Sequence, residues 1–414
     1  MKRWWQLGSL VPAIMIAAAL ANFGLSFKSL DWLAFRTWEV ARMVERPSGI
    51  GPFEPATIIR KEHAYGDLAN LGNMKDMREY RSEEFTVDQF GFRNVRSNQL
   101  SNPVGFVVGD SFTVGAAVRD SETLPAQLTN DAHGYFYNAG SGVEGGLDSL
   151  SEAQTISSML HLSSGILVFQ LLERSARETP YELLQLAEDN HARGSIEPQS
   201  IQERIERALL TTAVNRFVSN DSPGVILSRK LIKGAENDFW LPNPYRNAVV
   251  RRRLNNGDEI LFYGGDLNPA HSTKQLSSAW RTYLTAISGR LAKENITLIV
   301  MLVPNKFTVY GPLTDAVPGD SGGEEFLSGL EKELRTAGIP VLNLTPLFRT
   351  AAAQGLSRRE YLYWRDDTHW NARGIKLAAD ALWSEIQKGL AQDGNIDPSV
   401  AAGLPQGGIH RTGN

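Results

Sequence analysis

The sequence contains no cysteine, and this absence removes several kinds of chemistry at once. Disulfides, thiolate metal sites and a cysteine nucleophile are all excluded. An excess of positive charge is also missing, because 42 Lys and Arg residues face 46 Asp and Glu residues, for a formal net charge of -4. Such a chain has no polycationic character with which to neutralise nucleic-acid phosphates, so we expect no nucleic-acid partner.

A long hydrophobic run is missing as well, although the N-terminus has a short one. Two basic residues precede an apolar stretch from about Leu7 to Ala21, whereas a bilayer-spanning helix needs about 20 apolar residues. The pattern predicts a signal peptide over residues 1–21, cleaved after Ala21, or else an uncleaved membrane anchor that tethers the protein. Either one would carry the rest of the chain out of the cytoplasm, and a cysteine-free chain of this size fits a periplasm.

The remaining chain divides by its pattern into five parts. They are an N-terminal helical or extended segment (22–100) with an amphipathic helix before Pro47, the first half of a core (101–175), an insertion (176–275), the second half of the core (276–391) and a flexible Gly- and Pro-rich tail (392–414). Within the core, apolar runs alternate with stretches of helical periodicity. The runs are VGFVVG (104–109), YFYNAG (135–140), GILVFQLL (165–172), ITLIVMLVP (296–304) and IPVLNL (339–344). This alternation predicts a three-layer α/β/α domain with a central parallel sheet.

Ser111 stands where a catalytic nucleophile would be expected. It follows Gly109 and Asp110 directly after the first apolar run, and ligands of parallel α/β sheets gather beyond the carboxyl ends of the strands. Gly109 permits a sharp turn, and a helix starting there would direct its first amides at developing negative charge. An ordinary serine in a tight turn has the same local sequence. The interpretation therefore depends on a base elsewhere in the chain.

Among the seven histidines, His369 differs because two carboxylates precede it just ahead of the predicted last helix, in DDTH. A neighbouring acid can fix the tautomer of an imidazole and stabilise its charged form. The alternative is a solvated cap of that helix, with Asp367 or Thr368 at the N-cap position. Because a parallel sheet brings distant loops to one edge, we favour a site in which His369 serves Ser111.

Five short motifs carry a resemblance to a known family: VDQFGFRN (87–94), GDSFTVG (109–115), YNAGSGVEG (137–145), VPNKFTVYG (303–311) and DDTHWNARG (366–374). Together they resemble the SGNH hydrolase superfamily, within its alginate O-acetyltransferase-like (AlgX/AlgJ-type) branch. The resemblance covers roughly Phe85 to Leu390 apart from the insertion, and Asp-Thr-His-Trp is its most specific piece.

This resemblance implies a role for each matched residue. Ser111 would be the nucleophile, His369 the general base and then acid, and Asp367 the carboxylate that orients the imidazole. The wider superfamily places its acid three residues before the histidine, which would select Asp366 instead, whereas the Asp-Thr-His-Trp branch places it two before. The backbone amides of Ser111 and Gly140 would form the oxyanion hole.

Two features depart from the family's pattern. The Gly-x-Asn-Asp third block is absent and VFQLLERSARE stands in its place, which leaves Gln170 and Glu173 as candidates for a side-chain oxyanion donor. The serine also precedes the histidine, as in ordinary SGNH enzymes, whereas AlgX- and AlgJ-type proteins resemble a rearranged order. The polymer implied by the resemblance therefore stays open.

Three residues near the expected cleft are predicted to bind substrate. Lys306 and Tyr310 follow the run ITLIVMLVP and would grip a glycan, with solvent exposure of Lys306 and packing of Tyr310 as alternatives. Trp370 would wall the imidazole or stack on a sugar ring.

The resemblance implies an extracytoplasmic O-acetyltransferase of exopolysaccharide biosynthesis, which moves an acetyl group through an acetyl-serine intermediate onto polysaccharide hydroxyls. It implies no cofactor and no metal ion. Acetyl-CoA is not available outside the cytoplasm, so a membrane-bound O-acyltransferase partner would supply the acetyl group. A carbohydrate acetylesterase, with water as the acceptor, and a non-catalytic glycan-binding scaffold are the alternatives.

Overall fold

The computed structural model describes Ala17, Thr37 and residues 51–53, 55–95, 103–132, 134–141, 147–178, 248–267, 274–315 and 323–393. The predicted leader apart from Ala17, the amphipathic helix before Pro47 apart from Thr37, most of the predicted insertion and nearly all of the predicted tail lie outside these residues. Two compact units divide the chain, and the second contains Tyr65–Tyr80 together with the described residues from 103 onward. None of the helices in the described part has the length and apolar character of a membrane span.

The first unit contains an antiparallel hairpin of β1 (Ile58–Ala64) and β2 (Arg81–Thr86). The motif that follows β2 forms a tight turn around the buried carboxylate of Asp88, which accepts the backbone N–H groups of Phe90 and Phe92 at 2.8 and 3.1 Å. Gly91 lies in this turn at a φ of 88°, a backbone conformation that residues other than glycine rarely adopt.

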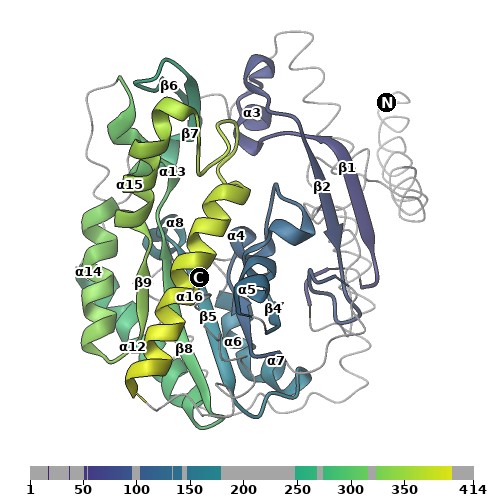
Figure 1. The fold of residues 1–414 in the computed structure, drawn as a ribbon, viewed down its shortest axis with the longest axis vertical. Helices are drawn as coiled ribbons and strands as arrows, with labels where there is room; N and C mark the ends of the chain where they lie inside the picture. The colour runs from purple at the N-terminus through teal and green to yellow at the C-terminus, as the bar shows by residue number, and fades with distance from the viewer. Residues whose placement is uncertain are drawn as a thin grey trace, which may run out of the picture. The chain divides into compact units, whose positions relative to one another are not determined.

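The second unit is built on a parallel sheet of five strands in the order β4-β3-β5-β8-β9 (Figure 1). The strands are β3 (Gly105–Val108), β4 (Phe136–Asn138), β5 (Gly165–Leu172), β8 (Ile296–Val303) and β9 (Val341–Asn343). Every pair of neighbours is parallel. Each strand falls within one of the five predicted apolar runs, and the predicted three-layer α/β/α fold is confirmed.

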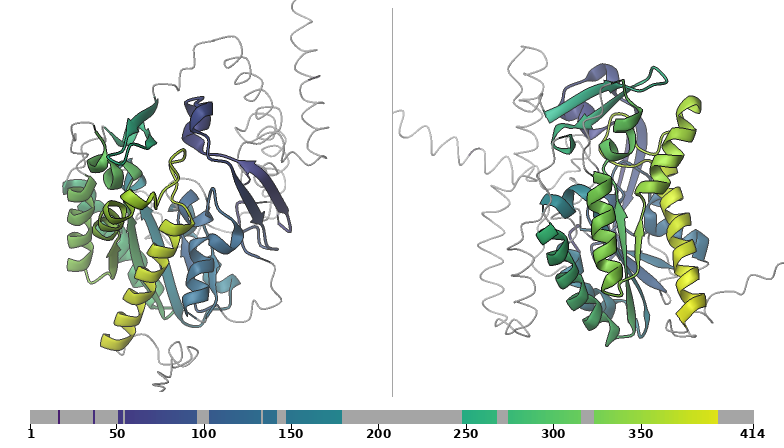
Figure 2. Two further views of the ribbon diagram at one scale, coloured as in Figure 1. Left: turned by 45° about the horizontal axis from the view of Figure 1, so that its top comes forward. Right: turned by 90° about the vertical axis from the view of Figure 1, so that its left-hand side faces the viewer.

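Helices cover both faces of this sheet. The larger ones are α5 (Leu124–Ala132), α12 (Lys274–Ala292), α14 (Gly323–Thr336), α15 (Thr345–Gly355) and α16 (Ala372–Asp393). On one face, a single hydrophobic cluster joins side chains of the sheet with those of α5, α15 and α16. On the other face, the ring of Trp280 on α12 lies 6.2 Å from that of Phe169 on β5. The right-hand view of Figure 2 shows α16 and α12 on opposite sides of the strands.

Short elements complete this unit, and several of them carry the polar residues of interest. They are α3 (Asp67–Leu71), η1 (Lys75–Met77), α4 (Ser111–Val114), α6 (Leu147–Ser151), α7 (Ala153–Met159), α8 (Glu173–Glu178), α13 (Lys306–Tyr310) and the antiparallel pair β6 (Val249–Arg253) and β7 (Glu259–Tyr263). Because β4 lies on one side of β3 and β5 on the other, the chain reverses its direction across the sheet there. Ligands bind at such switch points in open α/β sheets, and Ser111 directly follows β3.

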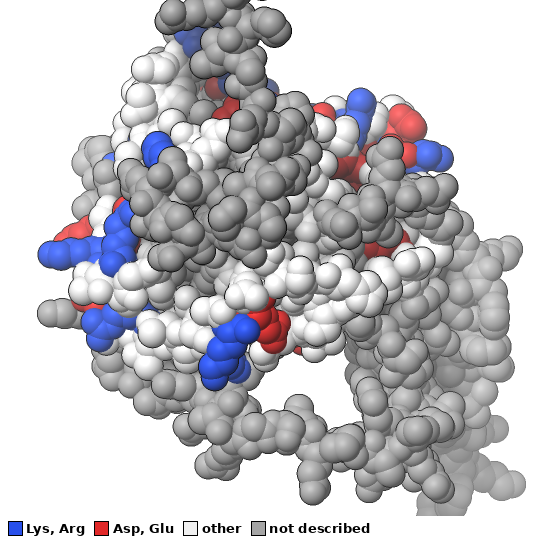
Figure 3. All heavy atoms as spheres, turned by 60° about the horizontal axis from the view of Figure 1, so that its bottom comes forward, with Lys and Arg blue, Asp and Glu red and all other residues white. Residues whose placement is uncertain are grey.

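Charged side chains are interspersed on the face drawn in Figure 3. There, Lys and Arg of the described residues lie among Asp and Glu instead of forming one large patch.

The contact between β3 and β5 provides a test of the sheet. A Cβ on Gly105 would lie 2.4 Å from the carbonyl oxygen of Ile166, whereas one on Gly289 of α12 would meet nothing within 4 Å. We expect Gly105→Ala to lower the free energy of unfolding by about 1–3 kcal/mol through overpacking. The matched Gly289→Ala should raise it by about 0.5–1 kcal/mol, because alanine favours helix. Chemical denaturation of the two variants measures both, and equal stabilities would contradict this packing.

Candidate active site

Hydrogen bonds to the Asp110 side chain stabilise the turn that carries Ser111. Asp110 caps α4, with its Oδ1 accepting the N–H of Phe112 at 2.9 Å, and its Oδ2 accepts the Ser175 hydroxyl at 3.2 Å. Burial raises the pKa of the Asp110 carboxyl, although the Phe112 N–H and His369 favour its charged form. A Cβ on Gly109 would lie 2.3 Å from the Thr113 hydroxyl oxygen, so only glycine fits at the start of this turn.

Ser111, His369 and Asp367 form a continuous chain of hydrogen bonds. The Oγ of Ser111 lies 2.8 Å from Nε2 of His369, and Nδ1 of His369 lies 2.7 Å from Oδ1 of Asp367. The backbone N–H of His369 donates to the same Oδ1 at 3.0 Å. Both His369 and Asp367 are buried, whereas Ser111 is half-buried. The arrangement matches the geometry of a nucleophile, a base and an orienting acid.

Asp366 faces different partners. Its Oδ2 accepts the backbone N–H groups of Gly66 and Glu79, at 2.7 and 2.8 Å, and the residue is fully buried. Two main-chain donors from a distant segment therefore use the carboxylate, and this geometry favours Asp367 over Asp366 as the acid that orients His369.

The two predicted oxyanion donors differ in their surroundings. Ser111 is the first residue of α4, where the backbone N–H has no partner within the helix. The N–H of Gly140 instead donates to Oδ1 of Asn138 at 3.0 Å, and Nδ2 of Asn138 donates to the carbonyl of Thr113. A Cβ on Gly140 would lie 2.7 Å from the backbone nitrogen of Val114. Gly140 thus packs closely against α4, but its predicted role requires its bond to Asn138 to open or to be shared.

Gln170 and Glu173, at the end of β5, have distinct environments. Oε1 of the buried Gln170 accepts the Thr113 hydroxyl at 2.8 Å, and its Nε2 has no hydrogen-bond partner in the described structure. Glu173 accepts the Asn305 N–H at 3.0 Å and the Thr308 hydroxyl at 2.7 Å. Burial raises the pKa of Glu173. Glu173 therefore supports the start of α13, and Gln170 supports the Ser111 turn.

Lys306 is buried, whereas a contact with a glycan would require its side chain to reach the solvent. It is 2% exposed, and its ammonium donates to the carbonyls of Arg365 and Asp367, each at 2.9 Å. Burial lowers its pKa to about 8, although Asp366 and Asp367 favour the charged form. The structure thus corrects the expected substrate contact, since Lys306 holds the chain around Asp367.

Tyr310 and Trp370 are also enclosed. The hydroxyl oxygen of Tyr310 accepts the N–H of Leu362 at 2.8 Å, and burial raises its pKa. Trp370 is fully buried with its ring 5.4 Å from that of Phe112, which itself lies 4.8 Å from the His369 imidazole. These contacts favour the packing alternative for Tyr310 and the wall of the imidazole for Trp370 over the expected sugar contacts. Trp370 supports the wall of the imidazole through Phe112, a residue not anticipated from the sequence.

Asp67 on α3 is the acidic residue that sequence reasoning missed. Its Oδ2 lies 3.8 Å from Nδ1 of His369, and its backbone N–H donates to Oδ2 of Asp367 at 3.0 Å. Oxygen or nitrogen atoms of these three residues lie within 4.8 Å of one another, close enough to hold a metal ion. Hydrogen-bond donors of the protein already occupy their carboxylates, however. No local pattern marks Asp67, because its partners lie 300 residues away.

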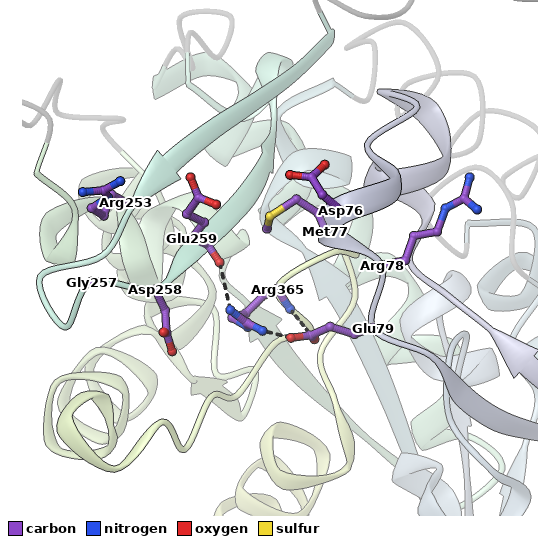
Figure 4. Close-up of a pocket in the computed structure, with 9 residues that line it drawn as sticks. All are labelled: Asp76, Met77, Arg78, Glu79, Arg253, Gly257, Asp258, Glu259 and Arg365. Carbon is purple, nitrogen blue, oxygen red and sulfur yellow. Dashed lines mark hydrogen bonds and ion pairs between the residues drawn. The ribbon is translucent and has the colours of Figure 1, made fainter. Parts of the chain in front are cut away.

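A polar pocket of about 390 Å³ lies beside the chain segment that leads into Asp366. It is lined by Asp76, Met77, Arg78, Glu79, Arg253, Gly257, Asp258, Glu259 and Arg365. Figure 4 shows the Arg365 side chain bonded to Glu79 and to the backbone of Glu259, and the Arg365 Nε lies 2.6 Å from Glu79 Oε1. The lining is strongly charged, which suits a hydrophilic ligand better than an apolar one.

Comparison with known proteins finds that part of this chain is similar to one protein family. Residues 257–402 match the family model described as SGNH hydrolase-like domain, acetyltransferase AlgX. The matched stretch contains Lys306, Asp367 and His369, and Ser111 lies outside it.

Sequence similarity to one known protein supports this match. The chain is 26% identical over 180 residues to a protein named probable alginate O-acetylase AlgJ from Pseudomonas putida. The alignment spans 44% of this chain and 42% of that relative, so less than half of either protein is compared. The predicted resemblance to the AlgX/AlgJ-type branch of the SGNH hydrolase superfamily is thereby confirmed.

The buried ammonium of Lys306 makes a pH-dependent contribution to stability. Its pKa is about 8 in the folded protein against 10.5 ordinarily, so the unfolded chain binds more protons between these values and stability rises with pH there. We expect the unfolding free energy of the wild type to rise relative to that of Lys306→Met from about pH 8 to 10.5. Denaturation of both proteins across this range tests it, because the other titrating groups are shared. A constant difference would contradict the lowered pKa.

Proposed function

We propose that this protein is a serine-dependent O-acetyltransferase that transfers acetyl groups to polysaccharide hydroxyls. The observation that carries the proposal is the hydrogen-bonded chain from Ser111 through His369 to Asp367 at the switch point of the sheet. The match to an acetyltransferase AlgX domain, together with the name of the relative, supports acetyl transfer and a polysaccharide acceptor.

In the first half-reaction, Ser111 Oγ attacks the carbonyl carbon of an acetyl donor while His369 Nε2 accepts the hydroxyl proton. The negative charge that develops on the carbonyl oxygen would be stabilised by the N–H of Ser111 and, once released from Asn138, by that of Gly140. The tetrahedral intermediate then expels the donor's leaving group, which takes the proton from His369. The product is acetyl-Ser111 with a neutral imidazole.

In the second half-reaction, a sugar hydroxyl attacks the acetyl-serine. His369 removes the hydroxyl proton as the new C–O bond forms, and returns it to Ser111 Oγ as the acyl–enzyme bond breaks. Asp367 keeps Nδ1 protonated throughout, which leaves Nε2 free to exchange protons with the serine. The residues present therefore account for both steps without a cofactor.

Water attacking the same intermediate would make the protein an acetylesterase. The two reactions share every protein group named above, and their ratio depends on how well the bound sugar is oriented and water is excluded. A non-catalytic glycan-binding scaffold is less well supported, because it would not need Ser111 Oγ within 2.8 Å of a buried imidazole.

The proposed location is the periplasm. The basic and apolar N-terminus supports export, either as a cleaved signal peptide or as an anchor in the inner membrane. Outside the cytoplasm the donor cannot be free acetyl-CoA, so we propose that a membrane-bound O-acyltransferase supplies the acetyl group.

Substitution of the proposed nucleophile tests the reaction. We expect Ser111→Ala to abolish release of the chromophore from a chromogenic acetyl ester, because it removes the oxygen that would form the acyl–enzyme. Ser157→Ala, a buried serine on α7, serves as the matched control and should retain activity. Mass spectrometry should detect an added acetyl group on Ser111 in the wild type.

The same assay with candidate oligosaccharides separates the possible functions. Acetylated sugar that depends on Ser111 supports the transferase, and chromophore release without acetylated sugar supports the esterase. Activity of Ser111→Ala within a few-fold of the wild type would remove the serine from the mechanism.

The two neighbouring acids should differ sharply in activity. Asp367→Asn disturbs the tautomer of His369 and should lower kcat by about three to four orders of magnitude. Asp366→Asn can still present an oxygen to the amides of Gly66 and Glu79, so its kcat should stay within about tenfold while its melting temperature falls. Steady-state kinetics on the acetyl ester ranks the two, and the opposite ranking would assign the orienting role to Asp366.

A further inference from the structure

The segment from Gly66 to Glu79 forms hydrogen bonds with the residues that precede His369. Backbone N–H groups at its two ends both donate to Asp366, and the N–H of Ala69 donates to the Asp366 carbonyl at 3.0 Å. A Cβ on Gly66 would lie 1.9 Å from that carbonyl oxygen, so the approach requires glycine. The Glu79 side chain pairs with Arg365, as Figure 4 shows. This segment therefore fixes the position of residues 365–367.

Asp67 also forms hydrogen bonds with Thr368. Its Oδ1 accepts the backbone N–H of Thr368 at 2.7 Å, and its Oδ2 accepts the Thr368 hydroxyl at 2.6 Å. Its own backbone N–H donates to Asp367 Oδ2 at 3.0 Å. Asp67 thus bonds to both residues that immediately precede His369.

The direction of the Asp67 carboxylate is not explained by capping of its own helix. An acidic residue in the first turn of a helix commonly accepts that helix's free N–H groups. In α3, however, the N-cap is Gly66, and no side chain caps the helix. The Asp67 carboxylate is instead directed across to Thr368, with Oδ2 at 3.8 Å from His369 Nδ1.

We propose that Asp67 is a positioning residue for the Ser111–His369 pair. Through Thr368 and Asp367 it fixes the imidazole, and its charge adds to that of Asp367 in stabilising the protonated imidazole formed during the reaction. This inference rests on the proposed function, since it assigns Asp67 a part in that same reaction.

The charge on Asp67 has a predictable effect on pH dependence. Among the described residues, the charged groups around His369 are Asp67 from α3, Asp367 beside it and Asp110 from the Ser111 turn, and the Lys306 ammonium contacts the carbonyl of Asp367. A nearby negative charge favours the protonated imidazole. Removing the Asp67 charge should therefore shift the acidic limb of the kcat/KM profile to lower pH.

The test compares Asp67→Asn with the wild type in the full chain, using hydrolysis of a chromogenic acetyl ester. We expect kcat to fall about 10- to 100-fold, as for outer carboxylates that orient metal-bound histidines, with KM within about twofold. The acidic limb should move to lower pH. Asp88→Asn is the matched control, because it alters a buried carboxylate in the first unit and should lower stability without moving that limb.

Each outcome decides the proposal. A wild-type kcat and pH profile in Asp67→Asn overturns it, and so does a fall in kcat with an unmoved acidic limb, which would indicate a purely structural role. If Asp67→Asn does not fold, Thr368→Val removes the hydroxyl bonded to Asp67, and a wild-type kcat in that variant overturns the proposal. Acetylation of Ser111 in the wild type, followed by mass spectrometry, is measured in parallel. If the acetyl group is absent there, the proposed function fails and Asp67 loses its role with it.

Discussion

Burial of charge without access to water is the constraint on which the site depends. Asp366, Asp367 and Lys306 are at most 3% exposed, and Asp67 is 9% exposed. Each buried charge would cost several kcal/mol if it lacked partners. Main-chain amides and carbonyls supply most of these partners. These bonds hold the backbone around His369 in place, as the proposed proton transfer by its imidazole would require.

The sheet determines which parts of the chain can take part in this arrangement. Ser111 follows β3, the side chains that support its turn come from the end of β5 and from α8, and Lys306 begins the helix after β8. All these segments lie at the carboxyl ends of parallel strands, so residues far apart in sequence meet at one edge. The hydrophobic cluster beneath them packs Phe112 and Trp370 with the helices on that face. The polar site therefore lies against a packed hydrophobic cluster.

Much of the fold could be predicted because the buried strands leave a strong local signal. Runs such as GILVFQLL and ITLIVMLV are apolar at nearly every position, as strands covered on both faces must be. The Ser111 turn and the DDTH motif could also be found, since each packs several polar or turn-forming residues into a short stretch. Their pairing across the sheet was a prediction from topology, and the 2.8 Å contact between Ser111 and His369 agrees with it.

Other features had no such local signal. Lys306 and Tyr310 follow a strand as surface ligands would, and only the tertiary packing shows that carbonyl and amide groups from the His369 region surround them. Asp67 sits in an unremarkable stretch, and its importance arises entirely from partners 300 residues later in the chain. Sequence patterns report periodicity over a few turns or strands, so contacts at this separation are invisible to them.

The great sequence separation of these contacts also has a consequence for biogenesis. Ser111 and His369 are 258 residues apart, and Asp67 and Thr368 are 301 apart. Chains are synthesised from the N-terminus, and contacts between distant residues form only when both have been made. A nascent chain can complete the turn around Ser111 long before its imidazole partner exists. The proposed acyl chemistry at the serine is thus delayed until the chain as far as His369 has been translated and folded.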